Sequence, residues 1–142
     1  MENPKPSSLL LSAVDIICKA AMQLKRSPKE PFTCLMLLTE REKKTYDLSP
    51  AYATNYELSI EAARQHVTDS YQKLFLYAIV CDGNVTRDGV TSDAMVIEAC
   101  EVGQGVRFHF IRCYNPPGFL HKAKAEENLT LLGFEPERVA AT

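Results

Sequence analysis

The fold is decided by residues 74–113, which read LFLYAIVCDGNVTRDGVTSDAMVIEACEVGQGVRFHFIRC. Three apolar runs are separated here by Asp88-Gly89 and by Gly103-Gln104-Gly105. An Asp-Gly pair between strand-like runs is the strongest short-range hairpin signal, because a type I′ turn needs a positive φ at both central residues. The pattern predicts a three-stranded antiparallel meander with strands at about 74–81, 94–101 and 106–113.

The length of each turn sets a pairing register, and the register decides which side chains share a face. A two-residue loop at 88–89 pairs Ile79 with Glu98, and a three-residue loop at 103–105 pairs Glu98 with Phe110. One face then surrounds Glu98 with apolar residues: Tyr77, Ile79, Cys81, Val96, Cys100, Phe108 and Phe110. The other face collects Leu76, Ala78, Val80, Ile97, Ala99 and Ile111, with Glu101 facing Arg107 and His109 at one end.

The residues before the meander predict a helix and two strands. Ser7 or Ser8 can cap a helix that runs to about Arg26, with apolar side chains at helical spacing. Residues 32–39 form a short apolar run, which we interpret as a buried strand, with a helix as the alternative. A second strand is expected at 45–48, after a charged turn.

Two further helices are predicted on either side of the meander. The run Thr54-Asn55-Tyr56-Glu57 has the form of a capping box and predicts a helix to about Lys73. After the break at Asn115-Pro116-Pro117-Gly118, residues 119–132 have helical composition, and Gly133 can end that helix. The tails at 1–6 and 135–142 are expected to be loose.

These elements predict a single α+β domain over residues 1–142, with a five-stranded antiparallel sheet and packed helices in the order α-β-β-α-β-β-β-α. That order is similar to that of profilin-like and roadblock-like domains, which are small platforms for dimerisation and for ligand or partner binding. The resemblance is one of element order alone. It therefore implies an architecture rather than an activity.

Composition and charge exclude several classes of function. The formal net charge is −2 and the sequence pI is near 5.9, whereas a general nucleic-acid binder needs a basic surface. The apolar runs at 9–11 and 34–38 are too short to span a bilayer, and Glu2 and Asp15 interrupt a secretory signal pattern. We therefore expect no nucleic-acid or membrane partner and a cytoplasmic protein.

The cysteines predict neither a metal site nor a disulfide framework. They are odd in number, lack C-x-x-C spacing, and lie within apolar runs: Cys18, Cys34, Cys81, Cys100 and Cys113. We expect them to be reduced and mostly buried, as small hydrophobic residues. The glycine-rich phosphate loops and the metal and hydrolase motifs that would indicate a cofactor are also missing from the sequence, so none is expected.

Glu98 is the candidate for catalysis, because the pattern places its carboxylate in an apolar face, where it needs a partner or a raised pKa. A structural pair with Arg112 is the favoured interpretation, and a general acid or base helped by His109 and Tyr77 is the alternative. A metal-dependent hydrolase or nuclease-like enzyme would use Asp93 and Glu98 as ligands.

A non-catalytic role fits the sequence better, because an enzyme should show at least one convergent set of polar residues. We expect a small protein-interaction or regulatory domain whose partner is another protein or a second copy, forming a homodimer. Val80, Ile97 and Ile111 are the candidate interface residues, because both sheet faces are apolar and the second needs a cover, which is either the chain's own C-terminal helix or a second subunit.

Overall fold

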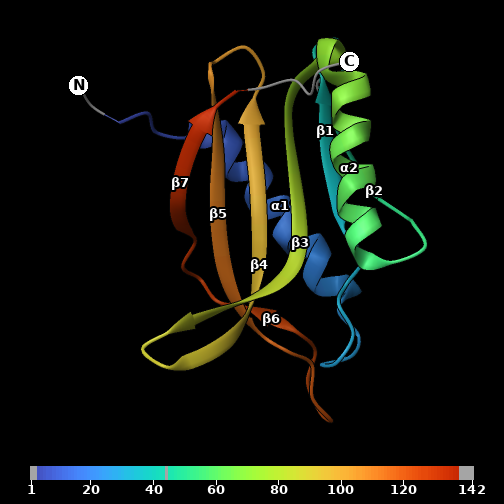
Figure 1. The fold of residues 1–142 in the computed structure, drawn as a ribbon, viewed down its shortest axis with the longest axis vertical. Helices are drawn as coiled ribbons and strands as arrows, with labels where there is room; N and C mark the ends of the chain where they lie inside the picture. The colour runs from blue at the N-terminus through green and yellow to red at the C-terminus, as the bar shows by residue number, and fades with distance from the viewer. Residues whose placement is uncertain (1–2, 44, 138–142) are drawn as a thin grey trace.

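A computed structural model shows an α+β fold with two helices and one curled antiparallel sheet (Figure 1), and it describes residues 3–43 and 45–137. The sheet order is β2-β1-β3-β4-β5-β6, and β7 pairs with β5 as well. The helical elements are α1 (Ser8–Leu24), α2 (Tyr56–Ser70) and the short 3-10 turn η1 (Tyr71–Lys73). The strands are β1 (Leu35–Glu40), β2 (Tyr46–Pro50), β3 (Leu74–Arg87), β4 (Val90–Glu101), β5 (Val106–Asn115), β6 (Lys124–Ala125) and β7 (Thr130–Pro136).

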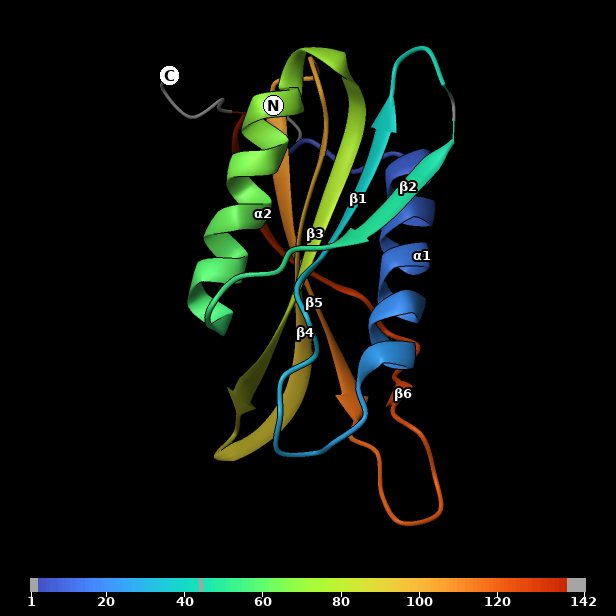
Figure 2. The ribbon, with the colours of Figure 1, turned by 90° about the vertical axis from the view of Figure 1, so that its right-hand side faces the viewer.

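The two helices cover opposite faces of the sheet, as Figure 2 shows. On the α1 face, α1 packs on β1, β3 and β4, and the core reaches β5 through Phe108 and Phe110. On the α2 face, α2 packs on β1 and β3, around Met36, Tyr77 and Ile79. The two helices therefore shield different amounts of sheet, and this difference positions the candidate site described below.

The caps of both helices are close to those expected. Ser7 caps α1 by accepting a hydrogen bond from the Leu10 amide at 3.1 Å. Asn55, rather than the predicted Thr54, caps α2 by accepting one from the Leu58 amide at 2.9 Å. An Asn side chain caps a helix at least as well as a Thr side chain. The predicted motif at 54–57 therefore does mark the start of the helix, with the cap one residue later than expected. The run at 32–39 forms β1 rather than a helix, as expected.

The β3–β4 hairpin confirms the register predicted from Asp88-Gly89. Asp88 has a φ of 51° and Gly89 a φ of 80°, as a type I′ turn requires. Arg87 pairs with Val90 and Ile79 with Glu98. Both strands are longer than expected, because the ladder continues without a break to the turn.

The predicted β4–β5 register is wrong by one residue. Glu98 pairs with His109, and not with Phe110. The loop between the two strands is one residue longer than predicted, because β4 ends at Glu101 and β5 begins at Val106, and the Val102 amide donates to the Phe75 carbonyl at 2.9 Å. A one-residue slip exchanges the faces of a strand. In β5 it moves Phe108 and Phe110 to the α1 face and brings Arg107, His109 and Ile111 to the face of Glu98.

The predicted third helix is replaced by strands, so the chain has two α-helices and not three among the described residues. Residues 130–136 form β7 along β5, where Gly133 pairs with His109 instead of ending a helix. The unpaired backbone of β5 provides a ladder of hydrogen bonds, and this long-range pairing overrides local helix propensity. Five strands were expected, and residues 3–43 and 45–137 contain seven.

The C-terminal tail is shorter than expected. Glu135 and Pro136 belong to β7, and the Glu137 carboxylate accepts hydrogen bonds from the amides of Gly103 and Gly105, each at 3.0 Å. The Tyr71 hydroxyl donates to the same carboxylate. Residues 1–2 and 138–142 lie outside the described part of the chain.

A buried ion pair fixes the end of α1 to the sheet. The Lys25 Nζ lies 2.8 Å from Asp82 Oδ2, and the two side chains are 4% and 6% exposed. The Phe32 amide donates to the same oxygen at 3.0 Å, and the Tyr114 hydroxyl donates to the other one. Because each charge is fully partnered, the pair can be buried. It ties α1 and the segment before β1 to β3 and β5.

Candidate functional site

The α2 face carries a group of charged side chains on the strands that α2 does not cover. Figure 1 looks onto this face, with β4, β5 and β7 side by side and α2 to the right of β3. Four residues of these strands form what we call the charged network: Glu98, Arg107, His109 and Glu135. Strand pairing brings them together, because Glu98 is opposite His109 and Arg107 is opposite Glu135.

Each carboxylate of the charged network has a cationic partner. Arg107 donates from Nε and Nη2 to Glu135 Oε1, at 2.9 and 2.6 Å, and the same oxygen is 2.6 Å from His109 Nε2. Glu98 is 3.9 Å from Arg107 Nη1, and its Oε2 accepts a hydrogen bond of 3.2 Å from the Tyr77 hydroxyl. Glu98 is thus satisfied by Tyr77 and Arg107, which is a structural arrangement for a carboxylate in a sheet.

The pKa shifts follow from these contacts. Hydrogen bonds from His109 and then Arg107 hold the pKa of Glu135 below its usual range. Burial raises the pKa of Tyr77, and the nearby Glu98 charge raises it further, so this hydroxyl stays protonated and donates. Burial alone would lower the pKa of Arg107, but Glu98 and Glu135 outweigh it and keep the guanidinium charged.

Two small cavities lie between α2 and the charged network. One of about 160 Å³ is lined by Arg64, Tyr77, Glu98 and Arg107, among others. Another of about 50 Å³ is lined by Arg64, Cys81, Glu98 and His109, among others. Ligand pockets usually measure roughly 300–1,000 Å³, so these two suit water or a small anion rather than a larger substrate.

The sequence identified three of these residues and missed three. Glu98, Tyr77 and His109 do come together, although Tyr77 and His109 border different cavities. The predicted Glu98–Arg112 pair is wrong, because Arg112 lies on the α1 face and its Nη2 is 2.9 Å from Asp15 Oδ1. Arg107 takes that place beside Glu98 because of the register slip. Glu135 and Arg64 could not be found, since the first was assigned to a loose tail and the second lies on a distant helix.

The structure separates the two carboxylates of the metal hypothesis. Asp93 and Glu98 are five residues apart on one continuous strand, so their side chains point to opposite faces. Asp93 lies near enough to Tyr114, on the α1 face, for its charge to raise the pKa of that hydroxyl. They cannot chelate one ion, and no group of three acidic, histidine or cysteine side chains within 3–43 and 45–137 is arranged to hold a metal.

The candidate interface residues lie in the interior. Val80 and Ile97 are 0% exposed beneath α1, and Ile111 is 5% exposed. After the register slip, Ile111 no longer shares a face with the other two. The helix α1 covers the face that was expected to take either the C-terminal helix or a subunit, so exposed apolar side chains must be sought elsewhere.

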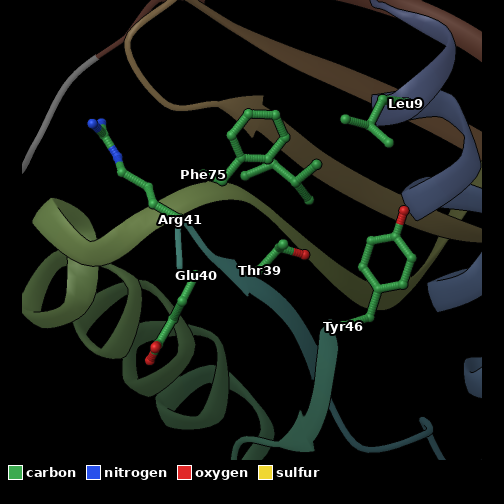
Figure 3. A pocket seen from close by; sticks show the side chains of 7 residues that line it. Leu9, Thr39, Glu40, Arg41, Tyr46 and Phe75 are labelled. Atoms are coloured by element: carbon green, nitrogen blue, oxygen red, sulfur yellow. The ribbon is translucent and has the colours of Figure 1, made fainter. Parts of the chain in front are cut away.

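A larger hollow of about 350 Å³ lies away from the charged network, on the α1 face near the N-terminal end of α1. Figure 3 shows Leu9, Phe75 and Tyr46 around the Thr39 hydroxyl, while the side chains of Glu40 and Arg41 point away from it. The Thr39 Oγ1 is buried and has no hydrogen-bond partner in the described part of the chain. This hollow is apolar and contains none of the residues singled out from the sequence.

Comparisons with known proteins give no relative from which the fold or the site could be interpreted. No family model matches the chain, and searches for similar curated proteins and for similar solved structures found no match. Among the described helices, none combines the length and the apolar character needed to cross a membrane.

Proposed function

We infer that this chain is a small protein-interaction or regulatory domain of the cytoplasm, which acts by contact rather than by catalysis and whose contact surface is the outer edge of β7. One observation carries this proposal. Three apolar side chains of this edge strand face solvent, with Leu131 42%, Leu132 57% and Phe134 44% exposed. Exposed apolar groups at a strand edge are typical of a surface that pairs with another chain.

The first five residues of β7 leave most of its outer edge without protection. Proteins usually guard an edge strand with charges, prolines or bulges, because its free backbone groups can pair with any other strand. Residues 130–134 read TLLGF, and the charge and the proline of this strand, Glu135 and Pro136, stand together at its end. At the opposite edge of the sheet, β2 reads YDLSP, where the charge of Asp47 lies within the strand. The position of the charge favours β7 as the edge that accepts a partner.

A second copy of the chain is the partner that fits best. Two β7 strands related by a two-fold axis run antiparallel, which satisfies the backbone groups of both edges and buries the same apolar side chains twice. Another protein that presents an extended segment could use the same hydrogen bonds. The closed charged network and the small cavities beside it support a role without catalysis. The free thiols support a cytoplasmic location.

The test is the mass of the chain in solution. Sedimentation equilibrium at high micromolar concentration should give a dimer for the unmodified chain and a monomer for Leu132→Lys, since lysine places a charge on the edge. Leu48→Lys is the matched control, because Leu48 is 43% exposed on the β2 edge, and it should stay dimeric. A monomeric unmodified chain, or an equal loss of dimer in both variants, would overturn pairing through β7.

A further inference from the structure

Two cysteines from neighbouring strands meet beneath α2. Cys34 comes directly before β1, Cys81 lies in β3, and their sulfur atoms are 3.5 Å apart. The β1–β3 register explains this approach, because Leu35 pairs with Val80 and the preceding residue therefore lies opposite Cys81. The sequence separates the two thiols by 47 positions and gave no sign of the pair.

The strand register at this pair is compatible with a disulfide. The Cys34 carbonyl accepts a hydrogen bond from the Ala51 amide at 2.9 Å, so the polar groups of Cys34 face β2 and not β3. Cys34 and Cys81 are thus a non-hydrogen-bonded pair, in which opposite Cα atoms lie about 4.5 Å apart. Disulfides span Cα separations of about 4.4–6.8 Å, and closing the bond to about 2.05 Å needs side-chain rotation rather than movement of a strand.

The two thiols differ in access and in charge. Cys34 is fully buried, whereas Cys81 is half-buried and borders the small cavity that also contains Arg64. The hydrogen bond from Cys34 lowers the pKa of Cys81, and the Arg64 charge lowers it as well. Cys81 is therefore the thiol that meets a reagent first, and Cys34 is the thiol behind it.

We propose that Cys34 and Cys81 form a reversible redox pair, which low-molecular-weight disulfides such as oxidised glutathione convert to an intramolecular disulfide. The Cys81 thiolate attacks one sulfur of the small disulfide, and one glutathione thiolate leaves. Cys34 then gives up its proton and attacks the Cys81 sulfur, which expels the second glutathione. One small disulfide is reduced to two thiols, and the protein loses two protons and two electrons.

The bond would join β1 to β3 and close a loop that contains β2 and α2. Closing a loop of this length restricts the unfolded chain, so the oxidised protein should unfold at a higher temperature than the reduced protein. In a reducing compartment such a bond is transient, which is how cytosolic redox sensors use disulfides. The pair would thus make the stability of the α2 segment depend on the thiol balance.

The experiment incubates the folded full chain with oxidised glutathione, alkylates the remaining thiols under denaturing conditions, and maps the peptides by mass spectrometry. The unmodified chain should lose two alkylation sites, at Cys34 and Cys81, without keeping glutathione, and its melting temperature should rise. Cys34→Ser should instead keep glutathione on Cys81, and Cys81→Ser should keep none on Cys34. Cys113→Ser is the control, since Cys113 is also half-buried, and it should behave like the unmodified chain.

The peptide map of the unmodified chain tests the proposal even if Cys34→Ser fails to fold. Cys34→Ala is a second variant at the same buried position. Five alkylated cysteines after treatment with oxidised glutathione would overturn the redox pair. A disulfide that maps to Cys18, Cys100 or Cys113, or that forms equally in Cys34→Ala, would overturn it too. Reduction by dithiothreitol should restore both the alkylation pattern and the lower melting temperature.

Discussion

The two faces of the sheet differ in how their charged side chains are buried and paired. On the α1 face, the helix covers a broad apolar core, and one ion pair, Lys25–Asp82, is almost fully buried with every charge partnered. On the α2 face, the helix packs on β1 and β3, and the charged network lies beyond it, with Glu98 13% and Glu135 39% exposed. Charges that a helix buries completely each need a specific partner, because water cannot solvate them. Where the helix covers the sheet only in part, water solvates the charges and several of them can interact at once.

Removing the buried aspartate tests the closed face most directly. Asp82→Ala leaves the Lys25 ammonium buried without a counter-charge, which should lower the free energy of unfolding by about 3–5 kcal/mol. Urea unfolding followed by circular dichroism measures the loss. Glu40→Ala is the control, because its pair with Lys43 is exposed, with Glu40 33% and Lys43 64% exposed, and it should cost less than about 1 kcal/mol. Equal losses would show that the two pairs are not buried differently.

Two neighbouring residues of β4 compare the faces without any charge. Ile97 is 0% exposed on the α1 face, and Val96 is 39% exposed on the α2 face. Ile97→Ala should lower the free energy of unfolding by about 2–5 kcal/mol, because it leaves a cavity in a closed core. Val96→Ala should cost less than about 1 kcal/mol, since solvent already reaches that side chain. A large loss at Val96 would mean that something covers the α2 face in solution.

The charged network should show coupling within one face only. Arg107→Met and Glu98→Gln should each lower the free energy of unfolding by about 1–2 kcal/mol, and the double variant by less than their sum. Pairing Glu98→Gln with Arg112→Met should give additive losses, because those two residues lie on opposite faces. Thermal melts of the five variants measure both cycles. Coupling of Glu98 with Arg112 instead of Arg107 would contradict the observed register and support the one predicted from the sequence.

Glu135 should give the smallest effect, as a dependence of stability on pH. Its pKa is held below the ordinary value of about 4.3 in the folded state, by His109 and then Arg107. Its stabilising contribution is therefore present above that ordinary value and is lost as the pH falls through the lower folded-state pKa. Exposure and salt should keep it under about 1 kcal/mol. Melting curves from pH 6 to pH 3 should converge for Glu135→Gln and the unmodified chain, whereas a constant gap would contradict the mechanism.

The sequence predicts local pairing well and distant pairing poorly. Asp88-Gly89 determines the β3–β4 register because both residues of that turn are adjacent in the chain. The β4–β5 register depends on whether Val102 belongs to the strand or to the loop, and Gly103 and Gly105 do not decide between the two. The predicted register differs from the observed one by a single residue, yet this difference exchanges Arg107 and Phe110 between the two faces of the sheet.

The same contrast explains which site residues were found. Tyr77 and Glu98 were placed together because the first hairpin was right. His109 was named as a candidate on the wrong face, and Arg107 was missed, because both depend on the second register. Glu135 was beyond reach, since it was assigned to a loose tail and only the pairing with β5 makes it part of a strand.

The pairing of β7 with β5 has a consequence for how the chain is made. Translation delivers β5 first, and the outer edge of β5 stays open until β7 has emerged, some twenty residues later. At ribosomal rates of about 5–20 residues per second, that interval lasts on the order of seconds. During it, an unpaired edge next to Phe108 and Phe110 is free to capture a neighbouring nascent chain. Neighbouring ribosomes on one message could therefore exchange β7 strands between copies, so that the risk of aggregation is greatest during synthesis.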